Sequence, residues 1–235
     1  MSEGMIRGLN DLNIPFDEGM LLAFDRYMEG ILEYNQKVNL TAITDREKFE
    51  EKHYLDSLSV CGLSEYMDAA TVIDVGTGGG FPGVPLAIIS PEKKFTLADS
   101  LMKRIKIIRA ITEEMGLTNV KAIHGRAEDL GQKDEYRGSF DLCVSRAVAD
   151  MAILSEYCLP MVKRGGYFIA YKTDRSDEEV EASEKAIRIL GGEIDRIERL
   201  NTAGMNHSLV VVKKIFDTPK KYPRKAGTPV KSPLR

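Results

Sequence analysis

The chain has few cysteines and no long apolar run, and each shortage excludes a class of protein. Its three cysteines, Cys61, Cys143 and Cys158, are far apart and lack CxxC spacing, which argues against a disulfide framework and a zinc site. The nearly apolar stretches 81–89 and 151–162 fall short of the roughly 18 residues that a membrane span needs. The first residues, MSEGMIRGLNDLN, lack the basic start and apolar core of a secretory signal. We therefore expect a reduced, cytoplasmic protein with no metal site and no membrane contact.

Other residue types occur in ordinary amounts, but the charges are unevenly distributed. Of the 235 residues, 43% are hydrophobic and 29% are charged, a balance typical of globular proteins. The formal net charge is −3, yet residues 213–235 hold eight basic residues and one acid, a net of +7 that leaves −10 on the rest. Four of the nine prolines also lie in this tail, so we expect it to be extended and free of helix. A basic extended arm favours a polyanionic partner; the alternative is a merely solvated terminus.

The first 65 residues contain two helical patterns. Apolar residues recur at spacings of three and four along one stripe, at Met20, Phe24, Tyr27, Ile31 and Tyr34. A second helix is predicted from Thr44, which forms a capping-box pattern with Glu47, to about Cys61. The polar segment NQKVNLTAIT between the two helices is expected to be a loop.

From Thr71 onward, short apolar runs alternate with helical stretches. Strands are predicted at 71–75, 95–99, 120–125, 140–145 and 165–172. Helices are predicted between and after them at 82–89, 101–115, 147–162 and 176–190. This alternation indicates an α/β, Rossmann-like, mostly parallel seven-stranded sheet, whose last two strands, EIDRIERL and SLVVVKKI, pair as an antiparallel C-terminal hairpin. We expect N-terminal helices over 1–65, the main domain over 66–216 and the basic tail over 217–235.

The strongest functional signal is VIDVGTGGGFPG, in which a buried strand runs into a glycine-rich turn and then a helix. Glycines let the backbone turn sharply and approach a ligand closely. A nicotinamide or flavin site favours G-x-G-x-x-G, but Phe81 replaces the third glycine, and Asp74 before the turn would repel a pyrophosphate. Asp99, at the end of the second strand, is placed to accept hydrogen bonds from ribose hydroxyls. A nucleoside with positive charge and no phosphate points to S-adenosylmethionine; a tight turn without a ligand is the alternative.

Later strand ends should add contacts, because ligands of open α/β sheets lie outside the carboxyl ends of the strands. After the third strand, HGRAEDL places Ala127, Glu128 or Asp129 where they can hold an adenine edge. Arg146 ends the fourth strand at the mouth of the cleft. It can hold the carboxylate of the cofactor, meet an RNA phosphate or form a structural ion pair.

Several motifs together resemble one bacterial family. They are YNQKVNLTAIT, EKHYLDSL, DVGTGGGFPGVPLAI, LADSLMKRIKII, GRAEDL and SRAVADM. From about residue 20 to the C-terminus, their order and spacing resemble the RsmG family, once called glucose-inhibited division protein B. The resemblance implies a class I methyltransferase that uses S-adenosylmethionine to modify N7 of one guanine in 16S rRNA. The family's cofactor contacts match Gly76, Phe81, Ala127, Glu128 and Arg146. With the positions argued from the residues, the predicted contacts are Asp74, Gly76, Thr77, Gly78, Phe81, Asp99, Ser100, Ala127, Glu128 and Arg146.

The end of the fourth strand lacks the groups that other methyl transfers need. A C5-pyrimidine methyltransferase needs a cysteine nucleophile there, and an enzyme acting on an exocyclic amine usually has an Asn/Asp-Pro-Pro-aromatic motif. The segment 144–147 offers neither, and Cys143 lies inside the strand, where burial as a small hydrophobe is expected. Guanine N7 carries an unprotonated lone pair, so its methylation requires alignment more than a base.

Candidates for that alignment lie mostly outside the sheet. Asn39 can hydrogen-bond a base edge or only hold its loop. His53 shares a helical face with Asp56 and can contact the substrate or pair with Asp56. Lys172, at the end of the fifth strand, can contact a phosphate or be solvated. The positioning candidates are thus Asn39, His53, Arg146 and Lys172, with no residue assigned as a chemical catalyst.

The predicted function is S-adenosylmethionine-dependent guanine-N7 methylation of 16S rRNA. We expect a monomer that acts on the RNA or on a 30S-related ribosomal particle. The basic group on the helix 101–115, at Lys103, Arg104, Lys106 and Arg109, can bind RNA or be a plain solvated face. Two rivals remain: a nicotinamide-dependent oxidoreductase, and a non-catalytic RNA-binding ribosome assembly factor.

Overall fold

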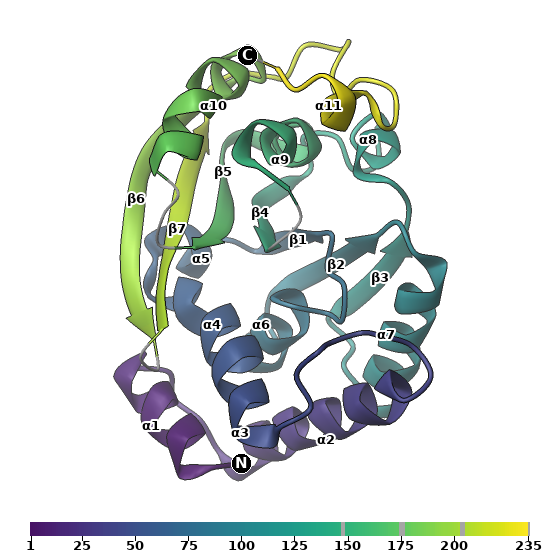
Figure 1. Ribbon diagram of the computed structural model, residues 1–235, viewed down its shortest axis with the longest axis vertical. Helices are drawn as coiled ribbons and strands as arrows, with labels where there is room; N and C mark the ends of the chain where they lie inside the picture. Colours follow the sequence, from purple (N-terminus) through teal and green to yellow (C-terminus); the bar gives the residue numbers. More distant parts are fainter. Residues whose placement is uncertain (147–148, 174–176, 203–204, 235) are drawn as a thin grey trace.

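A seven-stranded sheet with helices on both faces forms the centre of the molecule in a computed structural model that describes residues 1–146, 149–173, 177–202 and 205–234 (Figure 1). The strand order is β3-β2-β1-β4-β5-β7-β6. The strands β1 to β5 pair in parallel, whereas β5–β7 and β7–β6 are antiparallel. The bounds are β1 Thr71–Val75, β2 Lys94–Asp99, β3 Val120–His124, β4 Phe140–Arg146, β5 Val162–Thr173, β6 Gly192–Thr202 and β7 Met205–Lys214.

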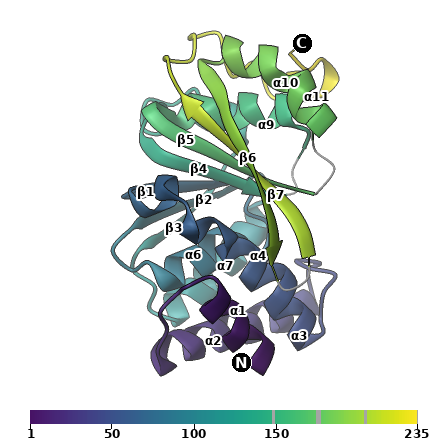
Figure 2. The ribbon, with the colours of Figure 1, turned by 90° about the vertical axis from the view of Figure 1, so that its left-hand side faces the viewer.

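One face of the sheet carries the N-terminal helices together with two of the crossover helices (Figure 1). Their bounds are α1 Glu3–Asp11, α2 Glu18–Asn35, α3 Arg46–Phe49, α4 Asp56–Leu58, α5 Ser64–Met67, α6 Gly83–Ile89 and α7 Met102–Glu114. The opposite face carries α8 Ala127–Leu130, α9 Met151–Cys158, α10 Asp177–Ile189 and α11 Thr228–Lys231. Figure 2 shows the long β6–β7 hairpin crossing one end of the sheet and reaching the N-terminal helices.

Two apolar cores lie on the two faces of the sheet, because successive strand residues point to opposite sides. In β1, Val72 packs into the core of the α2–α7 face, whereas Ile73 packs into the core of the α9–α10 face. Phe24 of α2 and Tyr54, both fully buried, belong to the same core as Val72. The N-terminal helices are therefore built into the main core.

The predicted α/β alternation and the antiparallel C-terminal hairpin are confirmed. Strands occur at every predicted place, with bounds within a few residues of those expected, because each is a buried run bordered by turn residues. The apolar stripe of α2 is also confirmed, with Phe24, Tyr27 and Ile31 buried. Residues 147–148, where a helix was predicted to begin, lie outside the described part. Within it, α9 begins at Met151, since the Asp150 side chain accepts a hydrogen bond from the amide of Ile153.

The predicted helix from Thr44 is wrong in its details. Asp45, not Thr44, caps α3, with its side chain accepting from the amide of Lys48. The segment that follows is not one regular helix. It passes from α3 through a π-helical turn, Glu50–Leu55, to α4 and a 3₁₀ turn, Ser59–Gly62. The helix α1 was not predicted; its Ser2 cap accepts from the amide of Met5, and its apolar residues Met5 and Leu9, four apart, are buried.

The prediction of an extended, helix-free tail is also wrong. The segment after β7 folds back against α8 and α9 and contains α11. Pro229 lies in the first turn of α11, where its missing N–H has no intrahelical partner to lose. Tyr222, with 7% of its surface exposed, is buried in the core of the α9–α10 face. Among the described residues, no helix is both long and apolar enough to cross a membrane.

Candidate active site

Two pockets open at the carboxyl ends of the parallel strands, on either side of the place where the strand order reverses between β1 and β4. In open α/β sheets this reversal leaves a crevice in which ligands bind. The first pocket is lined by residues after β1, β2 and β3, and the second by the ends of β4 and β5. Lys172 connects them: it lines the second pocket, and its Nζ donates to the carbonyl of Ala149, which lines the first, at 2.8 Å.

The glycine turn after β1 has a backbone that side chains would disturb. Gly76, Gly78 and Gly80 have positive φ angles of 76°, 60° and 85°. The amide of Gly76 donates to the carbonyl of Ala98 at 2.8 Å, and that of Gly78 donates to Asp99 Oδ2 at 3.0 Å. These bonds join the turn to the end of β2. The glycine content of the motif is therefore explained by its conformation, and the turn leaves the rim of the first pocket free of side chains at Gly76.

Asp74, near the end of β1, holds this turn through hydrogen bonds to both sides of it. Its Oδ2 accepts from Thr77 Oγ1 at 2.6 Å and from the amide of Gly83 at 2.9 Å. Its Oδ1 is buried without a hydrogen-bond partner among the described residues. Burial raises the pKa of this carboxyl to about 6, and the hydrogen bonds with Thr77 and Gly83 oppose that rise. A buried carboxylate with a free oxygen favours a cation nearby, as expected for a cationic cofactor, although Asp74 and Thr77 do not line the first pocket.

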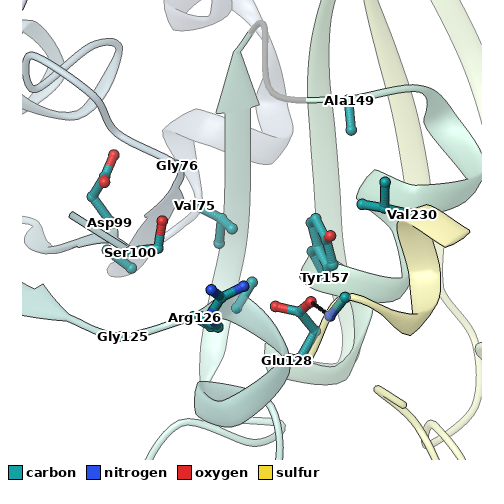
Figure 3. Close-up of a pocket in the computed structure, with 13 residues that line it drawn as sticks. Val75, Gly76, Asp99, Ser100, Gly125, Arg126, Glu128, Ala149, Tyr157 and Val230 are labelled. Carbon is teal, nitrogen blue, oxygen red and sulfur yellow. Dashed lines mark hydrogen bonds between the residues drawn. The ribbon is translucent and has the colours of Figure 1, made fainter. Parts of the chain in front are cut away.

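The first pocket has a volume of about 260 Å³ (Figure 3). Five of the predicted cofactor contacts line it: Gly76, Asp99, Ser100, Ala127 and Glu128. Asp99 is 4% exposed, and its Oδ1 accepts from the amide of Leu101 at 2.8 Å, so its carboxylate is fixed at the rim. The sequence did not indicate the lining residues of the opposite wall, Ala149, Tyr157, Gly227 and Val230. They come from α9, the segment before it and the C-terminal segment.

The second pocket, of about 590 Å³, brings together three of the four positioning candidates, His53, Arg146 and Lys172. Arg146 is the centre of this group. Its Nη1 donates to Asp56 Oδ2 at 2.6 Å and to the carbonyl of Lys52 at 3.1 Å. Its Nη2 lies 3.2 Å from His53 Nδ1. Of the alternatives left open for Arg146, a structural ion pair is thus present, and His53 and Asp56 meet through this guanidinium.

His53 is held as a neutral ring. It stacks on Phe81 with a centroid separation of 4.5 Å and an interplanar angle of 9°. Its Nε2 lies 2.7 Å from Thr41 Oγ1. Burial, and then the positive charge of Arg146, lower the pKa of His53 to about 3. Phe81 is 5% exposed and sits beneath His53 and Arg146, so this predicted cofactor contact lies on the side of the second pocket.

Lys172 and Asn39 differ in how firmly they are held. Lys172 forms an ion pair with Glu179 at 2.5 Å and has a side chain only 10% exposed, so it is not a solvated lysine. Asn39 is exposed, in a loop that Asn35 fixes by binding the amides of Leu40 and Thr41. Nothing places Asn39 in either pocket.

His207 of β7 lines the second pocket and was not predicted. It is 8% exposed, and both of its ring nitrogens are buried without a hydrogen-bond partner among the described residues. Its Nδ1 lies 3.5 Å from Asp56 Oδ1. In the sequence it lies at the start of an apolar strand, and only the pairing of β7 with the end of β5 brings it to the pocket.

The other polar groups that the sequence singled out lie outside both pockets and are either bonded within the fold, exposed or buried. Arg109 of α7 donates to the carbonyl of Ala122 at 2.6 and 2.8 Å, and Arg104 lies 3.4 Å from Asp99 Oδ2. Lys103 and Lys106 are exposed. Cys143 is fully buried, as expected, and burial raises the pKa of its thiol well above the ordinary value. A thiol in this state is a poor nucleophile.

Comparison with known proteins gives one consistent family. Residues 20–209 match the model described as "rRNA small subunit methyltransferase G". Ribosomal RNA small subunit methyltransferase G from Clostridium tetani is 46% identical over 228 residues, which cover 96% of this chain and 95% of the relative. The protein of the same name from Clostridium kluyveri is 48% identical over 225 residues, covering 96% and 95%.

Solved structures agree on the fold. An O-methyltransferase from Bacillus cereus in complex with SAH superimposes with a TM-score of 0.57 at 18% identity, covering 87% of this chain and 94% of that one. The O-methyltransferase TomG from Streptomyces achromogenes, in complex with SAM, gives 0.53 at 14% identity, covering 86% and 92%. The predicted class I methyltransferase fold is confirmed.

Proposed function

Because the chain belongs to the rRNA small subunit methyltransferase G family, we propose that it transfers the methyl group of S-adenosylmethionine to N7 of a guanine in small-subunit ribosomal RNA. One observation carries the proposal: a pocket suited to a nucleoside and a pocket lined by charged side chains and suited to a base adjoin at the strand-order reversal, and among the described residues no cysteine lines either of them.

The first pocket fits the nucleoside part of the cofactor. The Asp99 carboxylate is buried and fixed by backbone amides, with acceptor capacity left for ribose hydroxyls. Glu128 and the backbone of 125–127 offer acceptors and donors for an adenine edge. When bound, the cofactor supplies an electrophilic methyl group on a sulfonium. The buried carboxylate of Asp74, with one free oxygen, makes the surroundings of the turn favourable for that positive charge.

The second pocket fits the target base and its neighbouring phosphate. Arg146, Lys52 and Lys172 contribute positive charge. Asp56 holds Arg146 in place, and Glu179 holds Lys172. His53 stacks on Phe81, and the guanidinium of Arg146 lies 5.5 Å from the centroid of the same ring, so a planar base can pack at the edge of this group.

No proton has to leave guanine N7 before the methyl group moves, so the chemistry requires alignment and the exclusion of water. His53 is neutral because of its lowered pKa, and Arg146 occupies its Nδ1 side. His53 therefore positions the arginine and does not remove a proton. The buried Cys143 is likewise unsuited to covalent catalysis.

The rival functions have less support. A nicotinamide-dependent oxidoreductase is disfavoured by Phe81, whose side chain stacks on His53 at the position where the dinucleotide motif has its third glycine. An assembly factor that only binds RNA would have no use for the fixed Asp99 carboxylate beside the glycine turn. We further propose that the protein acts as a monomer on the RNA or on a ribosomal particle that contains it.

Transfer of labelled methyl groups to small-subunit RNA from cells that lack this protein tests the proposal. The expected product is 7-methylguanosine at a single position, located by nuclease digestion and mass spectrometry. Arg146→Gln should lower the rate at saturating cofactor while cofactor affinity stays within about threefold, whereas Lys185→Gln, at an exposed lysine of α10, serves as a matched surface control. Cofactor binding without any transfer would support an assembly factor, and methyl groups on a pyrimidine or an exocyclic amine would overturn the N7 assignment.

A further inference from the structure

The segment 217–231, here called the C-terminal strap, is fixed to the body by backbone carbonyls. Arg137 donates to the carbonyls of Thr218, Pro219 and Tyr222, at 2.7, 3.2 and 2.8 Å. Gln132 donates to the carbonyl of Pro223 at 2.7 Å. Because these side chains bind backbone carbonyls, they fix the position of the main chain in the first half of the strap.

A buried ion pair holds the second half. Glu156 of α9 is fully buried, and Arg224 binds both of its oxygens, with Nε at 2.9 Å from Oε1 and Nη2 at 2.6 Å from Oε2. The amide of Arg224 also donates to Glu156 Oε1 at 2.8 Å. Such bidentate, charge-assisted contacts fix both distance and orientation. The pair ties the strap to α9, which lies 68 residues earlier in the chain.

Three residues after this pair, the strap reaches the first pocket. The amide of Gly227 donates to Glu128 Oε1 at 2.9 Å, and Figure 3 shows this bond at the wall of the pocket. Gly227 has a φ of 82°, which turns the chain into α11 and brings Val230 to the same wall. Val230 is 58% exposed although it is apolar. A carboxylate held by the strap and an uncovered apolar side chain both border the space assigned to the nucleoside.

We propose that the C-terminal strap is a binding element for the cofactor: Gly227 orients the Glu128 carboxylate toward the adenine edge, and Val230 covers the nucleoside. This inference rests on the proposed function, because it assigns S-adenosylmethionine to the first pocket. The Arg224–Glu156 pair acts as the latch that keeps both residues in place. The inner side of the strap, with Gly227 and Val230, borders the cofactor. We call its exposed lysines the outer side: Lys220, Lys221, Lys225 and Lys231.

The strength of the latch determines the apparent affinity for the cofactor. If only the latched state binds well, the dissociation constant rises by the inverse of the latched fraction. Removing Arg224 leaves a buried carboxylate with a single backbone donor, so the strap is expected to open for a substantial part of the time. Removing Val230 beyond its β-carbon leaves the latch intact and takes away only apolar cover.

The test compares four proteins by titration calorimetry with S-adenosylmethionine: the full chain, a chain ending at Pro223, Val230→Ala and Arg224→Ala. We expect the dissociation constant to rise about tenfold or more for the shortened chain and for Arg224→Ala, and about threefold for Val230→Ala. Lys225→Gln, which removes an adjacent exposed charge, is the matched control and should stay within twofold.

A second readout separates binding from general damage. With saturating RNA, Arg224→Ala should raise the KM for the cofactor and leave kcat near that of the full chain, and Arg224→Lys should restore part of the loss. Because Val230 is exposed, Val230→Ala should not disturb folding, so it still tests the inference if the shortened chain does not fold. If both Val230→Ala and Arg224→Ala bind within twofold of the full chain, the strap inference is overturned while the proposed function stands. If the full chain itself does not bind the cofactor, the proposed function falls, and the strap inference with it.

Discussion

Substitution of Gly80 by alanine measures how tightly the glycine turn and helix α2 are fitted together. A β-carbon on Gly80 would lie 2.0 Å from Tyr27 Oη and 2.8 Å from Val84 Cγ2. Tyr27 is fully buried, and its hydroxyl donates to the carbonyl of Gly79 at 2.8 Å. The ring cannot move aside without leaving its place in the core. The new methyl group therefore displaces either Tyr27 or the turn.

The expected cost has three parts. The φ of 85° costs alanine about 1–2 kcal/mol. Loss of the Tyr27 hydrogen bond with its hydroxyl still buried costs about 1–3 kcal/mol. Repacking around the extra methyl group costs about 1–3 kcal/mol. Gly80→Ala should therefore lower the free energy of unfolding by about 3–8 kcal/mol, and cofactor affinity should fall at temperatures where the protein is still folded.

Gly116→Ala is the matched control. Gly116 has a φ of 70°, but a β-carbon there meets nothing within 4 Å. Only the backbone strain remains, about 1–2 kcal/mol, which for a chain of this size shifts Tm by about 2–8 °C. Urea unfolding of both variants and cofactor titration at a temperature below both transitions give the comparison. If the two substitutions lower the free energy of unfolding equally and cofactor affinity is unchanged, the proposed clash between the new methyl group and Tyr27 is refuted.

Three further predictions concern the site. Gly76→Val should abolish detectable cofactor binding, since a branched side chain at a φ of 76° distorts the rim of the first pocket; a folded variant that binds within threefold of wild type contradicts this. Because the pKa of His53 lies at about 3, single-turnover methyl transfer should show no rising limb between about pH 6 and 8.5, in the wild type or in His53→Gln. A limb near pH 6.5 that disappears in His53→Gln would show that His53 is a base. Below pH 6.5 the unfolded state takes up a proton on His53 that the folded state takes up only near pH 3, so the free energy of unfolding should fall as pH decreases through this window. His53→Gln should make that fall shallower by at most about 1.4 kcal/mol per pH unit; Asp74, whose pKa is raised to about 6, has the opposite effect between pH 6 and its ordinary value.

The parts of the fold that followed from the sequence are those with local causes. The strands β1, β2 and β4 are five to seven residues long, are mostly buried and are bordered by turn residues, and their alternation with helices indicates a parallel sheet. The glycine turn was recognisable because its conformation requires glycine at Gly76, Gly78 and Gly80. The end of β2 placed Asp99 at the first pocket for the same local reason.

The features that escaped prediction depend on partners far along the chain. Arg224 and Glu156 are 68 residues apart, and nothing in the composition of the tail distinguishes an arginine that will be buried against a carboxylate from one that faces solvent. His207 reaches the second pocket only through the pairing of its strand with β5. Capping by Asp45 in place of Thr44 depended on a choice between adjacent residues that both make good caps.

The fold of the tail changes how its charge can be used. Of the basic residues from 213 onward, Arg224 is paired with Glu156, and Lys214 is buried with its Nζ donating to the carbonyls of Leu159 and Leu190. Burial lowers the pKa of Lys214 to about 7. Neither is available to a phosphate, so contact with RNA from the described part of this region depends on its exposed lysines. The inner side of the strap borders the first pocket. If the strap closes over the cofactor as proposed, RNA bound to those lysines should stabilise the closed strap, and calorimetry should show that RNA and S-adenosylmethionine each raise the affinity for the other.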